Sequence, residues 1–230
     1  MPVILHLETS TSVCSVALSV DGKLVSDRIS FEGPSHAVLL APFVDEILCD
    51  MRTRDMRPDA VAVSCGPGSY TGLRIGVSMA KGLCYGWNVP LIAVDTLQLL
   101  AYSALKATTL DDSLLLCPMI DARRMEVFSA IFDQQLQFVR PIAADIVDGT
   151  TYLPWLENTP MLFLGNGADK CRMHITHPNA RFLTDIVPKA SEMIELSEKI
   201  FMKGQFVDTA YFEPFYLKDF VATVPKNKVL

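Results

Sequence analysis

Gly66-Pro67-Gly68-Ser69-Tyr70-Thr71-Gly72-Leu73-Arg74-Ile75-Gly76 is the most informative stretch of this 230-residue chain. It follows the apolar run 60–65, which predicts a buried strand, and it leads into a helix predicted over residues 71–85. Glycines at such a junction permit positive φ and let another backbone or a ligand approach closely. The spacing is neither that of a Walker A loop, which needs a lysine followed by serine or threonine, nor that of the dinucleotide fingerprint. A strand, a glycine-rich turn and a helix in this order predict a layered α/β domain.

A stripe of small residues continues into the predicted helix. Gly72, Gly76 and Ala80 recur every four residues, so they share one helical face. Such a face allows another element to come unusually close, and two interpretations are open at this point. The stripe can pack on the chain's own sheet, or it can meet a helix of another subunit.

The elements around this stretch indicate the topology. Apolar runs predict strands at Val3–Glu8, 13–20 and 23–31, and the last two are joined by an Asp-Gly hairpin signal. A helix is predicted to begin near Ser35, and the strand 90–95 and a helix over residues 96–106 follow the glycine-led helix. Three antiparallel strands followed by alternating helix and strand are typical of the RNase H-like, actin-like α/β fold.

The second half of the chain predicts a smaller α/β domain, so that the whole has two α/β domains with mixed sheets. The small polar residues 107–113 mark a junction, which gives an N-terminal domain over residues 1–106 and a C-terminal domain over residues 107–230. Residues 189–203 form an amphipathic pattern. This last helical segment is assigned to the second domain, with packing back on the first domain as the alternative.

Composition narrows the class of protein. Hydrophobic residues make up 50% of the chain, which predicts a sizeable core, and a net charge of −6 argues against gripping nucleic acid alone. The six cysteines include no C-x-x-C pair and are interpreted as reduced, buried thiols. No apolar run reaches the roughly 18 residues of a membrane span, and the N-terminus lacks a signal-peptide pattern. We therefore expect a cytoplasmic protein without membrane contact.

Two acidic residues are the strongest candidates for chemistry. Glu8 and Asp121 are each the last residue of a predicted strand, and a carboxylate pair across a cleft can bind magnesium with a nucleotide, with Ser10 beside it. The alternative interpretation is that both carboxylates cap turns. We favour capping, because no phosphate-binding lysine or second motif accompanies the pair.

Histidines and hydroxyls do not add a catalytic or metal centre. His174 and His177 are three residues apart in a polar stretch, which is a weak arrangement for metal binding. Ser69 and Thr71 have no histidine in their motif to activate them, so no nucleophile is predicted. Arg74 lies in the first turn of the glycine-led helix, where a cation opposes the helix dipole, so we expect it to pair with an acidic residue.

The chain resembles the TsaB family, also called YeaZ, over nearly its whole length. Residues 61–76, which include the glycine turn, are similar to the signature of that family. Further matches occur in the expected order at Glu8-Thr9-Ser10-Thr11, Ser35-His36-Ala37, Asp121-Ala122-Arg123-Arg124, Gly165-Asn166-Gly167-Ala168 and Pro214-Phe215-Tyr216-Leu217-Lys218. The departures are small, since the family commonly has Asp at Glu8, Phe at Tyr70 and Arg at Lys218.

The resemblance implies a role in tRNA modification. TsaB-like proteins, once labelled glycoproteases, are actin-like-fold subunits without catalytic activity of their own. They pair with a TsaD-like catalytic subunit and a TsaE-like ATPase, and the complex forms N6-threonylcarbamoyladenosine next to the tRNA anticodon with ATP and magnesium. This implies a scaffold subunit that binds no cofactor or metal alone, reaches tRNA through the complex, and can form homodimers through its N-terminal helices.

Two other functions compete with the scaffold role. One is an actin-like nucleotide-binding ATPase or sugar kinase that uses Glu8, Asp121 and the glycine turn, and the other is a metallopeptidase-like hydrolase.

The resemblance also implies where partners bind. The partner interface is predicted to comprise His36, Leu39, Leu40, Phe43, Gly66, Pro67, Gly68, Ser69, Tyr70, Thr71, Gly72, Leu73, Arg74, Gly76 and Ala80.

Overall fold

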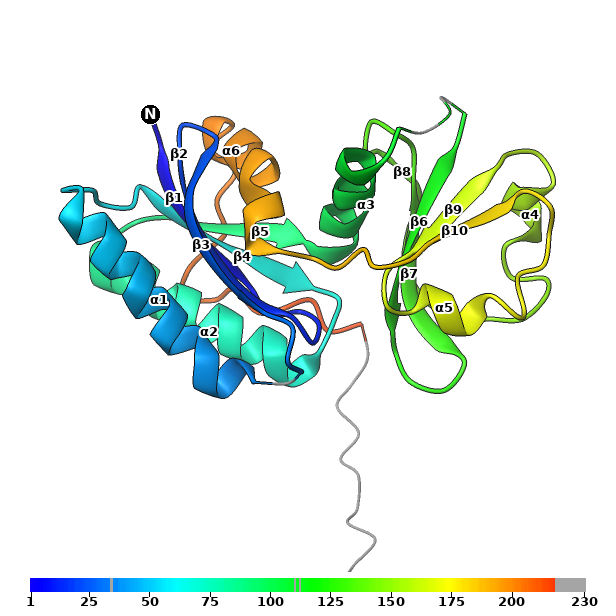
Figure 1. Cartoon of the computed structure of the whole chain (residues 1–230), viewed down its shortest axis with the longest axis horizontal. Helices are drawn as coiled ribbons and strands as arrows, with labels where there is room; N and C mark the ends of the chain where they lie inside the picture. The colour runs from blue at the N-terminus through cyan, green and yellow to red at the C-terminus, as the bar shows by residue number, and fades with distance from the viewer. Residues whose placement is uncertain (34, 110, 112, 218–230) are drawn as a thin grey trace, which may run out of the picture.

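The computed structural model describes residues 1–33, 35–109, 111 and 113–217 and contains two five-stranded sheets (Figure 1). The first sheet has the order β3-β2-β1-β4-β5 and comprises β1 (Val3–Glu8), β2 (Cys14–Val20), β3 (Lys23–Ser30), β4 (Ala60–Gly66) and β5 (Leu91–Asp95). The second has the order β10-β9-β6-β7-β8 and comprises β6 (Leu115–Asp121), β7 (Glu126–Phe132), β8 (Phe138–Ile146), β9 (Met161–Leu164) and β10 (Ala180–Leu183).

The two sheets share one connectivity. In the first, β1, β2 and β3 pair antiparallel, whereas β4 and β5 add in parallel on the other side of β1. The second repeats this plan with β6, β7 and β8 antiparallel and β9 and β10 parallel. The predicted α/β, actin-like class with two mixed-sheet domains is confirmed. The duplication is visible in the topology, although the sequence shows no repeat by identity.

Helices cover both faces of the first sheet. One face carries α1 (His36–Thr53) and α2 (Tyr70–Trp87), and the other carries η1 (Ala190–Met193) and α6 (Ile194–Met202). Successive side chains of a strand point to opposite faces, so Leu5 packs under α1 and α2 while its neighbour Ile4 packs toward η1 and α6. The last helical segment therefore lies on the N-terminal domain, although it follows the second sheet in the chain.

The helix α3 (Thr96–Ala107) lies between the two sheets (Figure 1). Leu97 and Leu100 belong to the core of the second sheet, whereas Leu99 and Tyr102 pack on the first sheet. The predicted boundary after residue 106 thus falls at the end of a helix that both domains share. The short helices α4 (Leu153–Leu156) and α5 (Ala168–Cys171) complete the second domain.

Two simpler expectations can be compared with the structure. All six cysteines are free thiols, and four of them are buried. The expectation of burial is wrong for Cys49, which is exposed, and Cys65 is only half-buried. No helix within the described part of the chain is long and apolar enough to cross a membrane.

A buried histidine joins β1 to α6. His6 has no exposed surface, its Nε2 lies 2.8 Å from Ser19 Oγ, and its Nδ1 lies 3.2 Å from Ser197 Oγ. Burial lowers the pKa of His6 from 6.5 to about 3, because the imidazolium would lose its hydration. As the pH falls below 6.5, His6 becomes protonated in the unfolded chain but stays neutral in the folded chain until the pH approaches 3. His6 therefore lowers the free energy of unfolding progressively between pH 6.5 and pH 3.

Replacing His6 should make the protein less sensitive to acid. Between pH 7 and pH 4 we expect the free energy of unfolding of the wild type to fall by about 3 kcal/mol more than that of His6→Gln. Burial raises the pKa of Glu8 and, to about 6, that of Asp95, so these groups destabilise the fold as pH rises. Glu8 and Asp95 are present in the wild type and in His6→Gln, so their contributions to the free energy of unfolding cancel when the two proteins are compared. Urea unfolding at several pH values measures the difference, and parallel pH profiles would refute the role given to His6.

Candidate functional site

The two candidate carboxylates occupy equivalent places, at the ends of β1 and β6, and both cap turns. Glu8 Oε1 accepts hydrogen bonds from Ser10 N at 2.6 Å and Ser10 Oγ at 2.5 Å. Asp121 Oδ1 accepts from Arg123 N at 2.9 Å and pairs with Lys170 Nζ. Glu8 and Ser10 have no exposed surface, so the structure contradicts their prediction as nucleotide contacts. The exposed Asp121 is already paired, and the capping interpretation accounts for both carboxylates.

Glu8 has an unusual environment. Burial raises its pKa, against the lowering effect of hydrogen bonds from Ser10 and of the neighbouring Ser64 hydroxyl. Within the described residues, Glu8 Oε2 and Ser64 Oγ are buried without a well-formed hydrogen bond. No group of three or more His, Cys, Asp or Glu side chains in this part of the chain is arranged to hold a metal ion.

The stripe of small residues faces inward. A Cβ atom on Gly72 would lie 2.1 Å from Thr9 O, and one on Gly76 would lie 2.2 Å from Thr9 Oγ1. Thr9 Oγ1 also donates a 2.8 Å hydrogen bond to Gly72 O, and Ala80 is fully buried. The chain's own β1–β2 turn therefore occupies the stripe, and the prediction that Gly72, Gly76 and Ala80 meet another subunit is wrong.

Other predicted interface residues divide by exposure. Close packing against the first sheet leaves several of them without a surface to offer, namely His36, Leu40, Gly66, Pro67 and Leu73. For these the interface prediction is also wrong. The residues with accessible surface are Leu39, Phe43, Gly68, Ser69, Tyr70, Thr71 and Arg74.

The chain's own C-terminal strap, residues 207–217, covers the glycine turn. Phe215 N donates to Cys65 O at 2.7 Å, and Phe215 O lies 2.8 Å from where a Cβ on Gly66 would be. Gly66 has φ +107, a conformation that favours glycine. The Tyr216 ring lies 4.7 Å from the Tyr70 ring. Sequence reasoning missed this contact, and Lys218, which follows the last residue of the strap, lies outside the described residues.

Lys81 fixes the strap to α2. Its ammonium group donates to Ala210 O and Phe212 O, both at 3.0 Å. Replacement by methionine keeps the aliphatic stem and removes both donors, so Lys81→Met should loosen the strap. We expect about fivefold faster amide hydrogen exchange at Phe215, equivalent to about 1 kcal/mol of local stability. Lys203→Met, on the exposed end of α6, is the control. Equal protection in both variants would show that Lys81 does not hold the strap.

The position of Arg74 in the first turn predicted an acidic partner, and the part of the chain that the structure describes supplies none. Arg74 Nη1 donates to Tyr70 OH at 3.1 Å, and its guanidinium carbon lies 5.5 Å from the Tyr70 ring centroid. No carboxylate of the described residues lies within 4 Å of the guanidinium, which is exposed.

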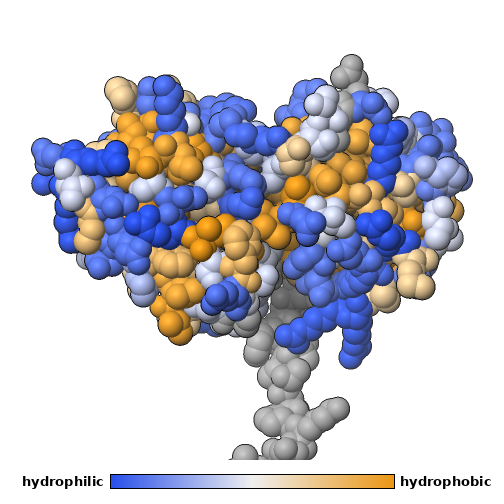
Figure 2. Space-filling model, in the orientation of Figure 1, coloured by the Kyte–Doolittle hydropathy of each residue, from blue (hydrophilic) through white to orange (hydrophobic). Residues whose placement is uncertain are grey.

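The outer face of α1 and α2 contains a shallow, mostly apolar groove. The groove has a volume of about 640 Å³ and is lined by Ala37, Arg74, Ile75, Ser78, Met79, Gly82 and Leu83. Val38 beside it is 72% exposed, and Tyr85 on α2 is 88% exposed. Figure 2 shows hydrophobic surface near the start of α1, at the lower left of the molecule.

A second run of small residues lies on this outer face. Ser78, Gly82 and Gly86 are also spaced by four residues, and they are exposed. A Cβ atom on Gly82 or Gly86 would meet no atom of the described residues within 4 Å. The sequence shows this spacing as clearly as that of Gly72, Gly76 and Ala80 on the other face of α2.

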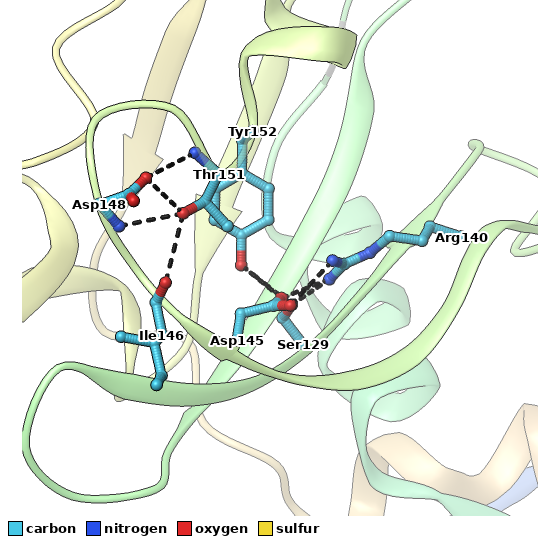
Figure 3. Close-up of polar contacts among 7 residues, drawn as sticks. All are labelled: Ser129, Arg140, Asp145, Ile146, Asp148, Thr151 and Tyr152. Atoms are coloured by element: carbon cyan, nitrogen blue, oxygen red, sulfur yellow. Dashed lines mark hydrogen bonds and ion pairs between the residues drawn. The ribbon is translucent and has the colours of Figure 1, made fainter.

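The second domain contains a closed polar network (Figure 3). Arg140 Nη1 and Nη2 donate to the two Asp145 oxygens at 3.0 and 2.6 Å, and Tyr152 OH donates to Asp145 Oδ2 at 2.8 Å. Burial alone would raise the pKa of Asp145, but Arg140, Ser129 and Tyr152 together hold it below its usual value. The network joins β7 and β8 to the start of α4 and leaves the Asp145 carboxylate fully engaged.

Comparisons with known proteins agree with one another. The family described as "TsaD: tRNA N6-adenosine threonylcarbamoyltransferase" matches residues 32–226. A Bacillus subtilis protein named "tRNA threonylcarbamoyladenosine biosynthesis protein TsaB" is 32% identical over 170 residues, covering 71% of this chain and 70% of that protein. A Haemophilus influenzae protein of the same name is 28% identical over 225 residues, covering 94% of this chain and 93% of that protein.

Solved structures show the same similarity. A structure described as "YeaZ from Pseudomonas aeruginosa" has a TM-score of 0.79 and 26% identity, covering 94% of this chain and all of that chain. A second Pseudomonas aeruginosa structure, described as an uncharacterized protein with similarity to peptidase YEAZ, has a TM-score of 0.80 and 26% identity. It covers 95% of this chain and all of that chain.

Proposed function

The chain belongs to the TsaB (YeaZ) family, and from this membership we propose that it is a non-catalytic subunit that binds a TsaD-related catalytic subunit. Its relatives are named for tRNA threonylcarbamoyladenosine biosynthesis, the pathway in which this chain takes part. Its role there is to hold the catalytic subunit in a competent arrangement while the adenosine next to the anticodon is modified.

The outer face of α1 and α2 is the observation that carries this proposal. An exposed apolar groove, two exposed glycines and an arginine that has no carboxylate partner within the described part of residues 1–217 occur together there, in a chain of net charge −6. Apolar surface of this kind is stabilised when a partner covers it. A helix of the TsaD-related subunit that offers apolar side chains and a carboxylate for Arg74 fits this face.

The geometry of the candidate chemical groups supports a non-catalytic role. Glu8 is buried in a turn, Asp121 is paired with Lys170, and Phe215 covers the glycine turn. We assign the use of ATP and magnesium to the rest of the complex, including a TsaE-like ATPase, and tRNA binding to the assembled complex. The site of action is the cytoplasm. A second copy of this chain can use the same face, so homodimer and complex should compete.

Reconstitution tests the proposal. The purified chain is mixed with the TsaD-related protein of the same organism, and the assembly is measured by size-exclusion chromatography with light scattering. Modification of unmodified tRNA is then followed with the chain present and omitted, at fixed TsaE-like ATPase. A stable complex and modification that depends on the chain are expected. Absence of a complex, or equal modification without the chain, would refute the scaffold role.

The rival ATPase interpretation predicts something different for the isolated chain. It requires magnesium-dependent ADP binding that is lost in Glu8→Ala. We expect calorimetry to detect no micromolar binding, because the Glu8 side chain has no exposed surface.

A further inference from the structure

The turn between β6 and β7 has an uncommon backbone. Arg123 and Arg124 are adjacent and both have positive φ, 70° and 52°. L-residues other than glycine, Asn and Asp rarely adopt this left-handed conformation, and two in succession are costly. Such a turn persists only where surrounding contacts determine it.

Lys170 supplies those contacts from α5. Its ammonium group pairs with Asp121 Oδ1 and donates to Arg124 O at 2.8 Å and Glu126 O at 2.6 Å. Asp121 Oδ1 in turn accepts from Arg123 N, and Glu126 N donates to Arg123 O at 3.2 Å. All three ammonium hydrogens of Lys170 are therefore used to hold the turn, which makes Lys170 a positioning residue.

The held turn presents two guanidinium groups to solvent. Arg123 and Arg124 are exposed, and no carboxylate of the described residues lies within 4 Å of either guanidinium. Nearby Arg172 differs, because it pairs with Asp169 at 3.6 Å and lies over the Phe182 ring. The charges of Asp121 and Lys170 offset each other, and the two arginines outnumber the one remaining carboxylate of the turn, Glu126. The exposed end of the turn is therefore locally basic in an acidic protein.

We propose that Arg123 and Arg124 bind neighbouring phosphates of the tRNA backbone when the chain is assembled with its catalytic subunit, an inference that rests on the proposed function. Guanidinium groups match phosphate geometry with paired donors, and a rigid turn loses less entropy than two free side chains. The turn belongs to the second domain, whereas α1 and α2 lie on the outer side of the first (Figure 1). A subunit docked on α1 and α2 therefore need not cover it. Because the net charge of the chain is −6, the protein as a whole repels a nucleic acid, and contact with phosphates is limited to a small basic surface such as this turn.

A pair of double variants tests the inference. Arg123→Asn with Arg124→Asn removes both charges while Asn tolerates positive φ, and the control Arg172→Asn with Arg181→Asn removes two arginines that have carboxylate partners. The dissociation constant of the complex for unmodified tRNA is measured between about 50 and 200 mM salt, because affinity that depends on phosphate contacts falls steeply in this range. We expect about tenfold weaker binding at about 100 mM and a salt slope lower by about 1.4 to 1.8.

Each outcome decides the question. Weaker binding and a flatter slope in the Arg123 and Arg124 variant alone, with an unchanged midpoint of thermal unfolding, support the inference. Equal loss in the control, or wild-type binding in both, refutes it and leaves the scaffold role standing. Loss of subunit affinity without loss of tRNA affinity refutes it in favour of an acidic protein surface. Failure of the wild-type chain to form the complex refutes the proposed function, and the inference with it.

A third variant separates the arginines from their support. Lys170→Met keeps both guanidinium groups but removes the donors that hold the turn. We expect it to weaken tRNA binding by a smaller factor than the double variant and to keep the wild-type salt slope, because the charges remain. A wild-type affinity in Lys170→Met would remove the positioning role of Lys170.

Discussion

Gly72→Ala should destabilise the protein by about 3 kcal/mol. The added methyl group would lie 2.1 Å from Thr9 O, a backbone atom at the end of the central strand. Relief would need α2 to move away from the sheet, which would also break the 2.8 Å hydrogen bond from Thr9 Oγ1 to Gly72 O. Because protein interiors are close-packed, that movement would be felt along the buried side of α2. Urea unfolding followed by circular dichroism measures the effect.

Gly82→Ala is the matched control on the same helix. Position 82 has open space where the methyl group would stand, and alanine has the higher helix propensity. We therefore expect Gly82→Ala to stabilise the protein by about 0.5 to 1 kcal/mol. The same substitution ten residues apart should thus have opposite signs. Similar effects at both positions would show that the inward face of α2 is assigned wrongly.

Val38→Glu combined with Gly82→Glu should abolish binding of the TsaD-related subunit while the chain remains folded. Both positions are exposed on the outer face of α1 and α2, and both would place an unpaired carboxylate in the covered surface. We expect at least about 100-fold weaker affinity, equivalent to about 2.7 kcal/mol. Calorimetric titration of the purified subunits measures this, and thermal unfolding checks the fold.

Met173→Glu is the control for that loss. Met173 is 88% exposed in the second domain, so its replacement changes the net charge and removes apolar surface without touching the groove. Wild-type affinity is expected for Met173→Glu. An unaffected affinity in the Val38 and Gly82 double variant would place the docking surface elsewhere.

The fold could be predicted because its signals are local. Apolar runs, the Asp21-Gly22 turn and the glycine junction each specify a strand, a hairpin or a helix start over a few residues. The pairing of β1 with both β2 and β4 then follows from the order of the elements. The repetition of this plan in the second domain was out of reach, because topology can be duplicated without any shared residue identity.

The inward and outward faces of α2 could not be told apart in the same way. Gly72-Gly76-Ala80 and Ser78-Gly82-Gly86 have the same spacing, and both are compatible with close approach. Only the position of Thr9, which comes from another element, decides between them. The exposed run is the better candidate for partner contact, and a helical wheel shows both runs equally.

The strap was missed for a different reason. Lys81 donates to the backbone carbonyls of Ala210 and Phe212, and a carbonyl group is present at every residue. No side-chain pattern near residue 210 could therefore indicate that this segment returns to α2. The support of the β6–β7 turn by Lys170 was equally invisible in the sequence, since two of the three acceptors of its ammonium group are main-chain oxygens.

The position of α6 and the strap has a consequence for synthesis of the chain. The strands of the first sheet all lie within residues 3–95, but the core around that sheet is complete only when residues 190–217 have packed against it. The link between His6 and Ser197 spans 191 positions. The second sheet lies within the single stretch 115–183. During synthesis, all strands of the second sheet have therefore left the ribosome before α6, the helix that covers β1, has been made. The second domain can thus finish folding before the first. A nascent chain stalled before residue 190 would expose the apolar face of the first sheet to chaperones.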